Sequence, residues 1–343
     1  MSTSIHIPSI HLRTASQGFG LVELMISMVL GLIVIGGVIS VFLANQQTTS
    51  ANQALGAVQD GSRIASEFLS RDIRDAGLTG CGNAGRVANV VNNNTTNWWA
   101  NWNNALMGYD DASQDAAINT TPGVGQPIAN TSSIQLIGVQ GGGFSVNAQN
   151  ATSATFTLNE ITSTLQTGDI VMVCDPNHAT IFQISNASSS NTTLVYNTGT
   201  VVSPGNCSKG MGYPTLCTTN GTPYVFSINA QIAQLFADDW YIGINGMGGQ
   251  SLFRSAMTNV AGAVSAYPQE MVRNVTNMQI KYLVSPGTAF TTASNVGAAN
   301  WGSVTAAQIT LTVSVPIHPN NLATTTSVTR QFTDTVTLRN RVN

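Results

Sequence analysis

The hydrophobic pattern along the chain first predicts a long apolar helix. From Phe19 to Ala44 there are 26 residues, almost all apolar, without a Lys, Arg or Asp. At about 1.5 Å per residue, a helix of this length crosses the hydrocarbon core of a bilayer with some tilt to spare. No small-residue cleavage site of the ordinary secretory type follows the run. We therefore expect residues 19–44 to form a transmembrane helix.

A second helical pattern follows directly and carries an apolar stripe. Apolar or small residues recur at spacings of three and four, which places them on one helix face. The stripe consists of Leu55, Val58, Ala65, Phe68, Leu69, Ile73 and Ala76. We expect residues 45–77 to continue the same helix as an amphipathic half packed on the protein's own sheet, and Gly77 and Gly80 to end it.

The pattern then changes to strands. Short β-branched segments separated by Gly, Asn or Ser recur from Ser133 onward. Clean alternation of apolar and polar residues predicts antiparallel sheet with one buried face, and it is clearest at 277–284, 306–316 and 330–340. Residues 78–343 should therefore form a β-rich globular head, in which the Asn- and Gly-rich stretch 87–130 is a long loop or insertion. The predicted fold class is α+β.

Composition and charge narrow the classes of function. Only 8% of the residues are charged, against about 25% in typical domains. The polar, uncharged remainder suits an extracytoplasmic β-rich protein with many turns. The chain has 12 Lys and Arg residues, a net charge of -3 and no basic run. It therefore carries no nucleic-acid signature.

The four cysteines suggest two disulfides. An even number of cysteines in a chain that leaves the cytosol favours disulfide pairing. Of the three possible connectivities, we favour Cys207 with Cys217 and Cys81 with Cys174. A zinc site is the alternative, but no close Cys-x-x-Cys pair is present and His178 is the only histidine nearby.

Glu23 needs an explanation, because it is the only formal charge in the apolar run. An acidic side chain at the centre of a bilayer costs about 2.5–3.5 kcal/mol, and such residues usually have a partner. If the chain is cut after Gly18, Phe19 becomes a new N-terminus with a free amino group about one turn away. In a bundle of parallel helices, Glu23 of one subunit could pair with the amino group of the next.

The stretch "GFGLVELMISMVLGL" resembles the class III signal of type IV pilins. The resemblance implies cleavage by a prepilin peptidase between Gly18 and Phe19, so that residues 1–18 are the leader, and N-methylation of Phe19. Glu23 matches the glutamate of the family pattern. Further segments resemble minor pilins of the PilW type in order along the chain, among them "GSRIASEFLSRDIRDAGLTGC", "QEMVRNVTNMQIKYLV" and "FTDTVTLRNRV".

The resemblance implies a type IV pilin-like fold and a minor pilin that primes pilus assembly at or near the tip, with roles in twitching motility, adhesion or DNA uptake. Expected partners are the major pilin, other minor pilins, a tip adhesin, the prepilin peptidase, the assembly platform and the lipid of the inner membrane. Arg13 precedes the span and no basic residue follows it closely, which predicts a single-pass protein with a cytoplasmic N-terminus. After assembly the chain should be extracellular, in the pilus.

Two other groups of residues are candidates for binding. Asp110, Asp111 and Asp115 could hold calcium, but they lack the spacing and terminal Glu of an EF-hand loop, so a solvated acidic turn is favoured. Trp98, Trp99 and Trp102 could bind a sugar or a partner, although we favour rings that cap the end of a sheet.

The sequence carries no recognisable enzyme motif, and we expect neither catalytic residues nor a cofactor. Asp175 and His178 are close in the chain, but no serine lies in a nucleophile-elbow motif, and "CDPNHA" reads as a turn between two strands. Two alternatives to the minor pilin remain. One is a pseudopilin of a type II secretion system, and the other is a membrane-anchored periplasmic binding domain.

Overall fold

The protein is described here from a computed structural model, which covers residues 20–81, 86–162, 164–317 and 326–341. The predicted leader 1–18 and the residue Phe19 lie outside the described residues. The chain divides into two units, and each is considered by itself. Of the described residues, one unit contains 20–53 and Ile317, and the other, the head unit, contains those within 54–316 and 326–341.

Helix α1 extends from Leu21 to Asp75 as one helix of 55 residues. It ends close to the predicted position. Gly77 adopts a positive φ of 75°, and its N–H donates to the carbonyl of Ile137 at 2.7 Å. Gly138 permits the close approach of this helix end, since a Cβ at that position would collide with the carbonyl oxygen of Asp75 and the ring of Phe236. The absence of a side chain at Gly138 therefore fixes how the end of α1 packs on the sheet.

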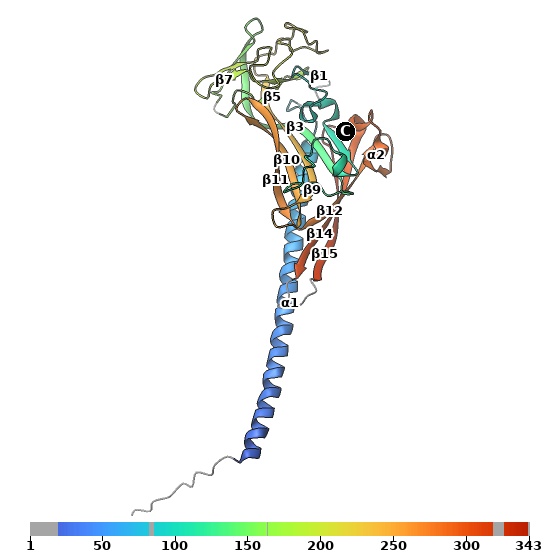
Figure 1. Ribbon diagram of the computed structural model, residues 1–343. Coiled ribbons are helices and arrows are strands. Elements are labelled where there is room, and N and C mark those ends of the chain that lie inside the picture. The colour runs from blue at the N-terminus through green and yellow to red at the C-terminus, as the bar shows by residue number, and fades with distance from the viewer. Residues whose placement is uncertain (1–19, 82–85, 163, 318–325, 342–343) are drawn as a thin grey trace, which may run out of the picture. The chain divides into compact units, whose positions relative to one another are not determined.

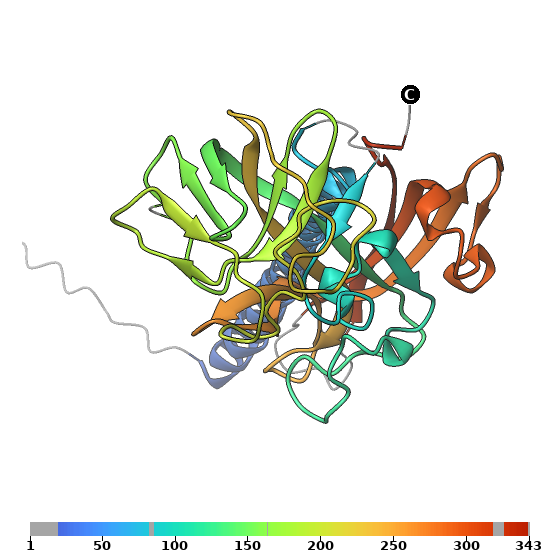
Figure 2. The ribbon, with the colours of Figure 1, turned by 90° about the horizontal axis from the view of Figure 1, so that it is seen from above.

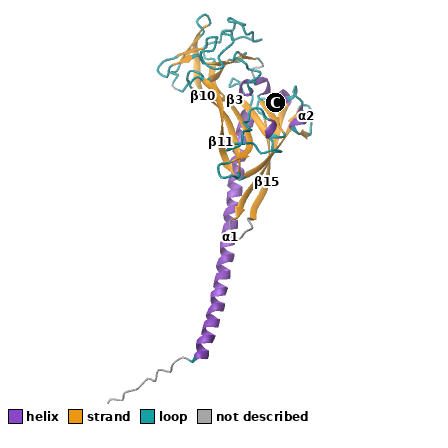
Figure 3. Ribbon diagram, viewed as in Figure 1, coloured by secondary structure: helices purple, strands orange, loops and turns teal. Residues whose placement is uncertain are grey.

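The larger of two sheets in the described residues has eleven strands (Figures 1 and 3). They are β1 (Val87–Asn89), β2 (Leu106–Tyr109), β3 (Ser133–Asn150), β4 (Thr155–Leu158), β5 (Ile170–Cys174), β6 (Ala179–Gln183), β7 (Asn186–Ala187), β8 (Thr193–Val195), β9 (Gln231–Ile244), β10 (Gln250–Val260) and β11 (Ala263–Arg273). The main path has the order β1-β6-β5-β9-β3-β4-β8-β7, while β10 pairs with β9 and β11, and β2 pairs with β3. Only the β1–β6 pair among these is parallel.

The smaller sheet has four strands in the order β13-β12-β14-β15. Its strands are β12 (Val275–Val284), β13 (Phe290–Thr291), β14 (Val304–Ile317) and β15 (Thr326–Thr337). A short helix, α2 (Ala293–Val296), follows β13, and four 3-10 turns, at Trp98–Ala100, Trp102–Asn104, Ala112–Gln114 and Trp301–Ser303, complete the described elements. The alternation expected for 277–284 and 306–316 is observed from Met278 to Tyr282 and from Ala307 to Val313, where every second side chain is buried.

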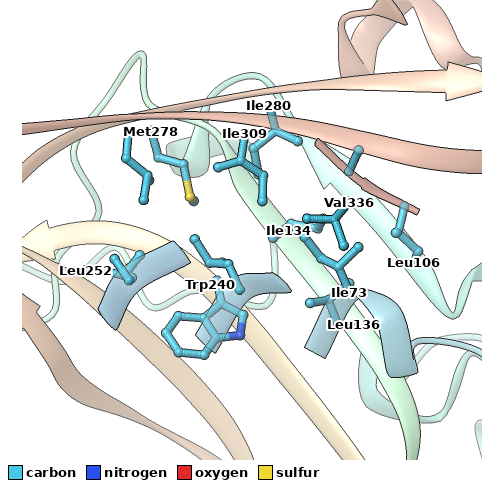
Figure 4. Close-up of a cluster of buried hydrophobic side chains, with 14 of the residues drawn as sticks. Ile73, Leu106, Ile134, Leu136, Trp240, Leu252, Met278, Ile280, Ile309 and Val336 are labelled. Carbon is cyan, nitrogen blue, oxygen red and sulfur yellow. The ribbon is translucent and has the colours of Figure 1, made fainter. Parts of the chain in front are cut away.

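The main hydrophobic core of the head unit joins α1 to both sheets (Figure 4). Ile73 of α1 lies among side chains of β2, β3 and β15, and Trp240 of β9 lies near Leu252 of β10. Met278, Ile280 and Ile309 contribute from the smaller sheet. The antiparallel sheets and the long helix confirm the predicted α+β, pilin-like class.

The head differs locally from what the sequence predicts. Strand β9 runs unbroken from Gln231 to Ile244, through the charged pair Asp238 and Asp239. Strand β11 was not predicted because it contains Pro268, which an edge strand tolerates. The stretch 87–130 is not only loop, since it contributes β1 and β2 to the larger sheet.

Candidate functional site

The first part of α1 presents a continuous apolar surface. Every large apolar side chain from Leu21 to Leu43 is exposed, with exposed fractions between 45% at Leu43 and 78% at Leu21. An 18-residue window within α1 has a mean hydropathy of 2.7 and no buried residue. By length and composition, this is the one helix in the described residues that could cross a membrane. The surface is suited to lipid or to other apolar helices.

Glu23 lies in the first turn of this apolar helix. Its backbone N–H donates to the carbonyl of Gly20 at 3.0 Å, and the hydroxyl of Ser27 donates to its main-chain carbonyl at 2.7 Å. Neither contact uses the carboxylate, which has no partner among the described residues. A carboxylate in the hydrocarbon of a bilayer is costly, and such residues usually have a partner.

The second part of α1 anchors the helix in the head unit. Val58, Ala65, Leu69 and Ile73 of the predicted stripe are fully buried in the main core. Phe68 is 36% exposed, but its ring stacks on the indole of Trp240 at 6.2 Å between centroids. The predicted amphipathic half therefore does pack on the protein's own sheet.

A polar network lies beside this helix–sheet contact. The indole N–H of Trp240 donates to the Asp72 carboxylate at 2.9 Å, and the Arg254 guanidinium lies 5.9 Å from the Trp240 ring centroid. Arg254 is also 3.9 Å from the carboxylate of Asp238. Burial, followed by the nearby Asp72, raises the pKa of Asp238 to about 7, although Arg254 opposes the shift. Two carboxyl groups thus share one cation at the α1–β9 contact.

The opposite face of β9 carries a second buried acid. Asp239 pairs in register with Gln135 of β3 and is fully buried. Burial, and then the neighbouring Asp115, raises the pKa of Asp239 well above its usual value. Asp115 accepts hydrogen bonds from the Ser133 hydroxyl and the Gln135 amide. Sequence reasoning missed Asp238 and Asp239, for which the available signal was the charged pair "DD" inside an apolar stretch.

The structure does not assemble a calcium site from Asp110, Asp111 and Asp115. Asp110 accepts the backbone N–H groups of Ala293 and Ser294, each at 2.9 Å. Burial alone would raise its pKa, but these hydrogen bonds outweigh burial and lower the pKa. Asp111 caps the 3-10 turn that begins at Ala112, and Asp115 faces Ser133 and Gln135.

Across the described residues, no group of three or more His, Cys, Asp or Glu side chains could hold a metal ion. The solvated acidic turn that we favoured is also wrong for Asp115, which is only 1% exposed. Its carboxylate is part of the packing between β3 and the loop that follows β2.

Two disulfides fasten the head unit. Cys81 bonds to Cys174 of β5, and Cys207 bonds to Cys217, which are the two pairs favoured from the sequence. The first bond links the segment after α1 to the larger sheet across a sequence separation of 93 residues. The second closes a local loop with a separation of 10 residues.

Three tryptophans and His178 take part in packing and hydrogen bonds within the head unit. Trp98, Trp99 and Trp102 belong to or pack on a cluster that includes side chains on one face of β5, β6 and β9, and not at the end of a sheet. His178 ends a tight turn between β5 and β6, in which Asp175 accepts the backbone N–H of His178 at 2.9 Å. The His178 imidazole contacts the carbonyl of Met211 at 2.6 Å.

Comparison with known families gives two matches. Residues 13–39 match the model of the prokaryotic N-terminal methylation motif, and residues 239–337 match the model of type IV pilus-assembly protein W. Neither the curated proteins nor the solved structures gave a match. The methylation motif on a long apolar helix, joined to a head of antiparallel sheet, defines a membrane-anchored type IV pilin. The second match identifies the chain more closely as a minor pilin of the PilW type.

Proposed function

We propose that this minor pilin primes the assembly of type IV pili and is incorporated at or near the pilus tip. The observation that carries the proposal is the Glu23 carboxylate, which lies unpartnered on an exposed apolar helix. Cleavage after Gly18 would free the amino group of Phe19 about one turn away. In a parallel bundle, that amino group on a neighbouring subunit supplies the charge that Glu23 lacks.

The proposal implies an ordered route for the chain. It first resides in the inner membrane with its N-terminus in the cytoplasm, and the prepilin peptidase then cuts it and Phe19 is N-methylated. The assembly platform moves it into a bundle with the major pilin and other minor pilins, where the head can engage a tip adhesin. Residues 78–343 are a bulky head that suits a cap better than a repeating shaft. The protein acts as a structural subunit in this scheme, not as an enzyme, and needs no cofactor.

Removal of the Glu23 charge tests the pairing. We expect Glu23→Ala and the nearly isosteric Glu23→Gln to remain membrane-bound and to be cleaved. Both variants should enter pili at least about tenfold less, and a factor of ten corresponds to a loss of about 1.4 kcal/mol in the free energy of pairing. Immunoblots of sheared pili and of membranes measure both quantities. Gly18→Ala is the control that blocks maturation and leaves the longer precursor on the gel. Normal incorporation of both Glu23 variants would contradict the mechanism.

A further inference from the structure

A groove on the head unit lies between two segments that are far apart in the sequence. Its volume is about 220 Å³, and it is lined by the 3-10 turn around Trp102 and by the loop around Tyr213. Strand β1 borders it through Val87 and Asn89. Figure 2, which shows the molecule from above, displays the teal turns that follow β1 beside the yellow loop that precedes β9.

The walls of the groove are held by contacts that leave its surface side chains free. The backbone N–H of Asn89 donates to the Thr215 hydroxyl at 3.0 Å, which ties the two segments together. The side chain of Asn94 donates to the carbonyl of Asn89 at 2.7 Å, and the Cys207–Cys217 disulfide closes the loop that carries Tyr213. The groove is thus built by hydrogen bonds and a covalent link before any ligand arrives.

Three polar side chains on this surface remain available. Thr95, Asn101 and Asn103 line the groove, and their side chains make no hydrogen bond within the described part of the chain. Each Asn amide offers both donors and an acceptor, and the Thr hydroxyl offers one donor and two lone pairs. Tyr213 is 56% exposed, so its ring has an open edge or face toward the solvent.

The chemistry of the lining restricts the ligand. None of the lining side chains is charged, so nothing there would compensate a phosphate, a carboxylate or an ammonium group. Aromatic rings pack against apolar C–H surfaces, while amides and hydroxyls exchange hydrogen bonds with neutral polar groups. A sugar ring presents both features together, with apolar C–H faces and hydroxyl groups at its rim. The volume corresponds to about seven water molecules, which suits a single sugar ring.

From these observations we propose that the groove between Trp102 and Tyr213 binds one residue of a neutral saccharide. The rings of Trp102 and Tyr213 contact the sugar faces, and Thr95, Asn101 and Asn103 hydrogen-bond the hydroxyls. This site is separate from the assembly function of Glu23, so it can be tested in protein that does not enter pili. It would give the head of a minor pilin a direct contact with a glycan surface.

The test uses the full chain purified in lauryldimethylamine oxide, because detergents with sugar headgroups would compete for the groove. Glucose, galactose, N-acetylglucosamine and N-acetylgalactosamine are screened by saturation-transfer difference NMR. We expect at least one of them to bind with a dissociation constant of about 1 mM. Tyr213→Ala and Asn103→Ala should each weaken that binding at least about tenfold.

The matched control is Tyr267→Ala, which removes a tyrosine of similar exposure, 53%, from β11 outside the groove. It should leave saccharide binding unchanged. Near-ultraviolet circular dichroism confirms that all three variants remain folded, and neither Tyr213 nor Asn103 is buried. The proposal is overturned if none of the four sugars binds at about 20 mM. It is equally overturned if Tyr213→Ala and Asn103→Ala bind the saccharide as well as the unmodified chain does. Binding of a neutral Asn-Gly-Thr peptide in the groove, without binding of the sugars, also overturns it.

Discussion

Asp238 and Asp239 are neighbours in β9, and their side chains lie on opposite faces of the sheet. Asp238 lies beside Asp72 and Arg254 at the contact with α1, whereas Asp239 lies beside Asp115 under the loop after β2. Both carboxyl groups are buried, and burial is the main reason that both pKa values are raised. Burial in the head therefore shifts both carboxyl groups towards their protonated forms.

The raised pKa of Asp238 predicts a specific dependence of stability on pH. A folded-state pKa of about 7, above the unfolded value near 3.8, favours folding at low pH, and this contribution is lost as the pH rises through about 7. Asp238→Asn should therefore raise the free energy of unfolding at pH 8 by up to about 4 kcal/mol relative to the native chain, and should change it little at pH 4.

Urea unfolding at the two pH values measures this difference. The exposed Asp60→Asn is the control and should show no such dependence on pH. A gain for Asp238→Asn that is the same at pH 4 and pH 8 would show that ionisation of Asp238 does not weaken the fold.

At the scale of elements, helix α1 meets two different environments along its length. Its side chains from Leu21 to Leu43 are exposed and apolar, while Val58, Leu69 and Ile73 are buried in the head unit. The stripe from Val58 to Ile73 follows the helical period, which is why the sequence was sufficient to find it. The exposed run was equally visible, because its composition does not depend on contacts with the rest of the chain.

Leu69→Ala should show how strongly the buried stripe holds α1 in the head. Leu69 is 0% exposed, and a buried Leu→Ala change costs about 2–5 kcal/mol through lost burial and the cavity left behind. Ile64→Ala on the same helix is the matched control, because Ile64 is 40% exposed and its loss should cost less than about 1 kcal/mol. Urea titration of the full chain, followed by tryptophan fluorescence, compares them. Equal losses would mean that the stripe does not anchor the helix.

At the scale of the whole molecule, the helix and the methylation motif are features that a pilus subunit would share with a pseudopilin of a type II secretion system. Gene deletion separates the two roles. We expect loss of the gene to reduce surface pili and twitching motility, which piliation counts and subsurface agar assays measure. Secretion of exoproteins should stay normal in the culture supernatant. Retained pili with lost secretion would instead assign the chain to a secretion system.

The sequence by itself determined the features that are set by local periodicity and composition. These are the apolar run with Glu23, the amphipathic stripe up to Ile73, and the alternating strands at 277–284 and 306–316. Side chains return to the same face of a helix or strand at fixed sequence intervals, so a buried face appears as apolar residues at that spacing. The cysteine pairing was favoured from spacing, but only the structure selected it from three connectivities.

Only the tertiary structure decided which polar residues are buried and which distant segments meet. Asp is depleted in strands, yet the pairing of β9 with β3 and β10 holds both Asp238 and Asp239 in a strand. Trp102 and Tyr213 line one groove although more than a hundred residues separate them. Burial of a carboxyl group and the meeting of two loops depend on contacts between remote parts of the chain. Local sequence patterns therefore do not predict either feature.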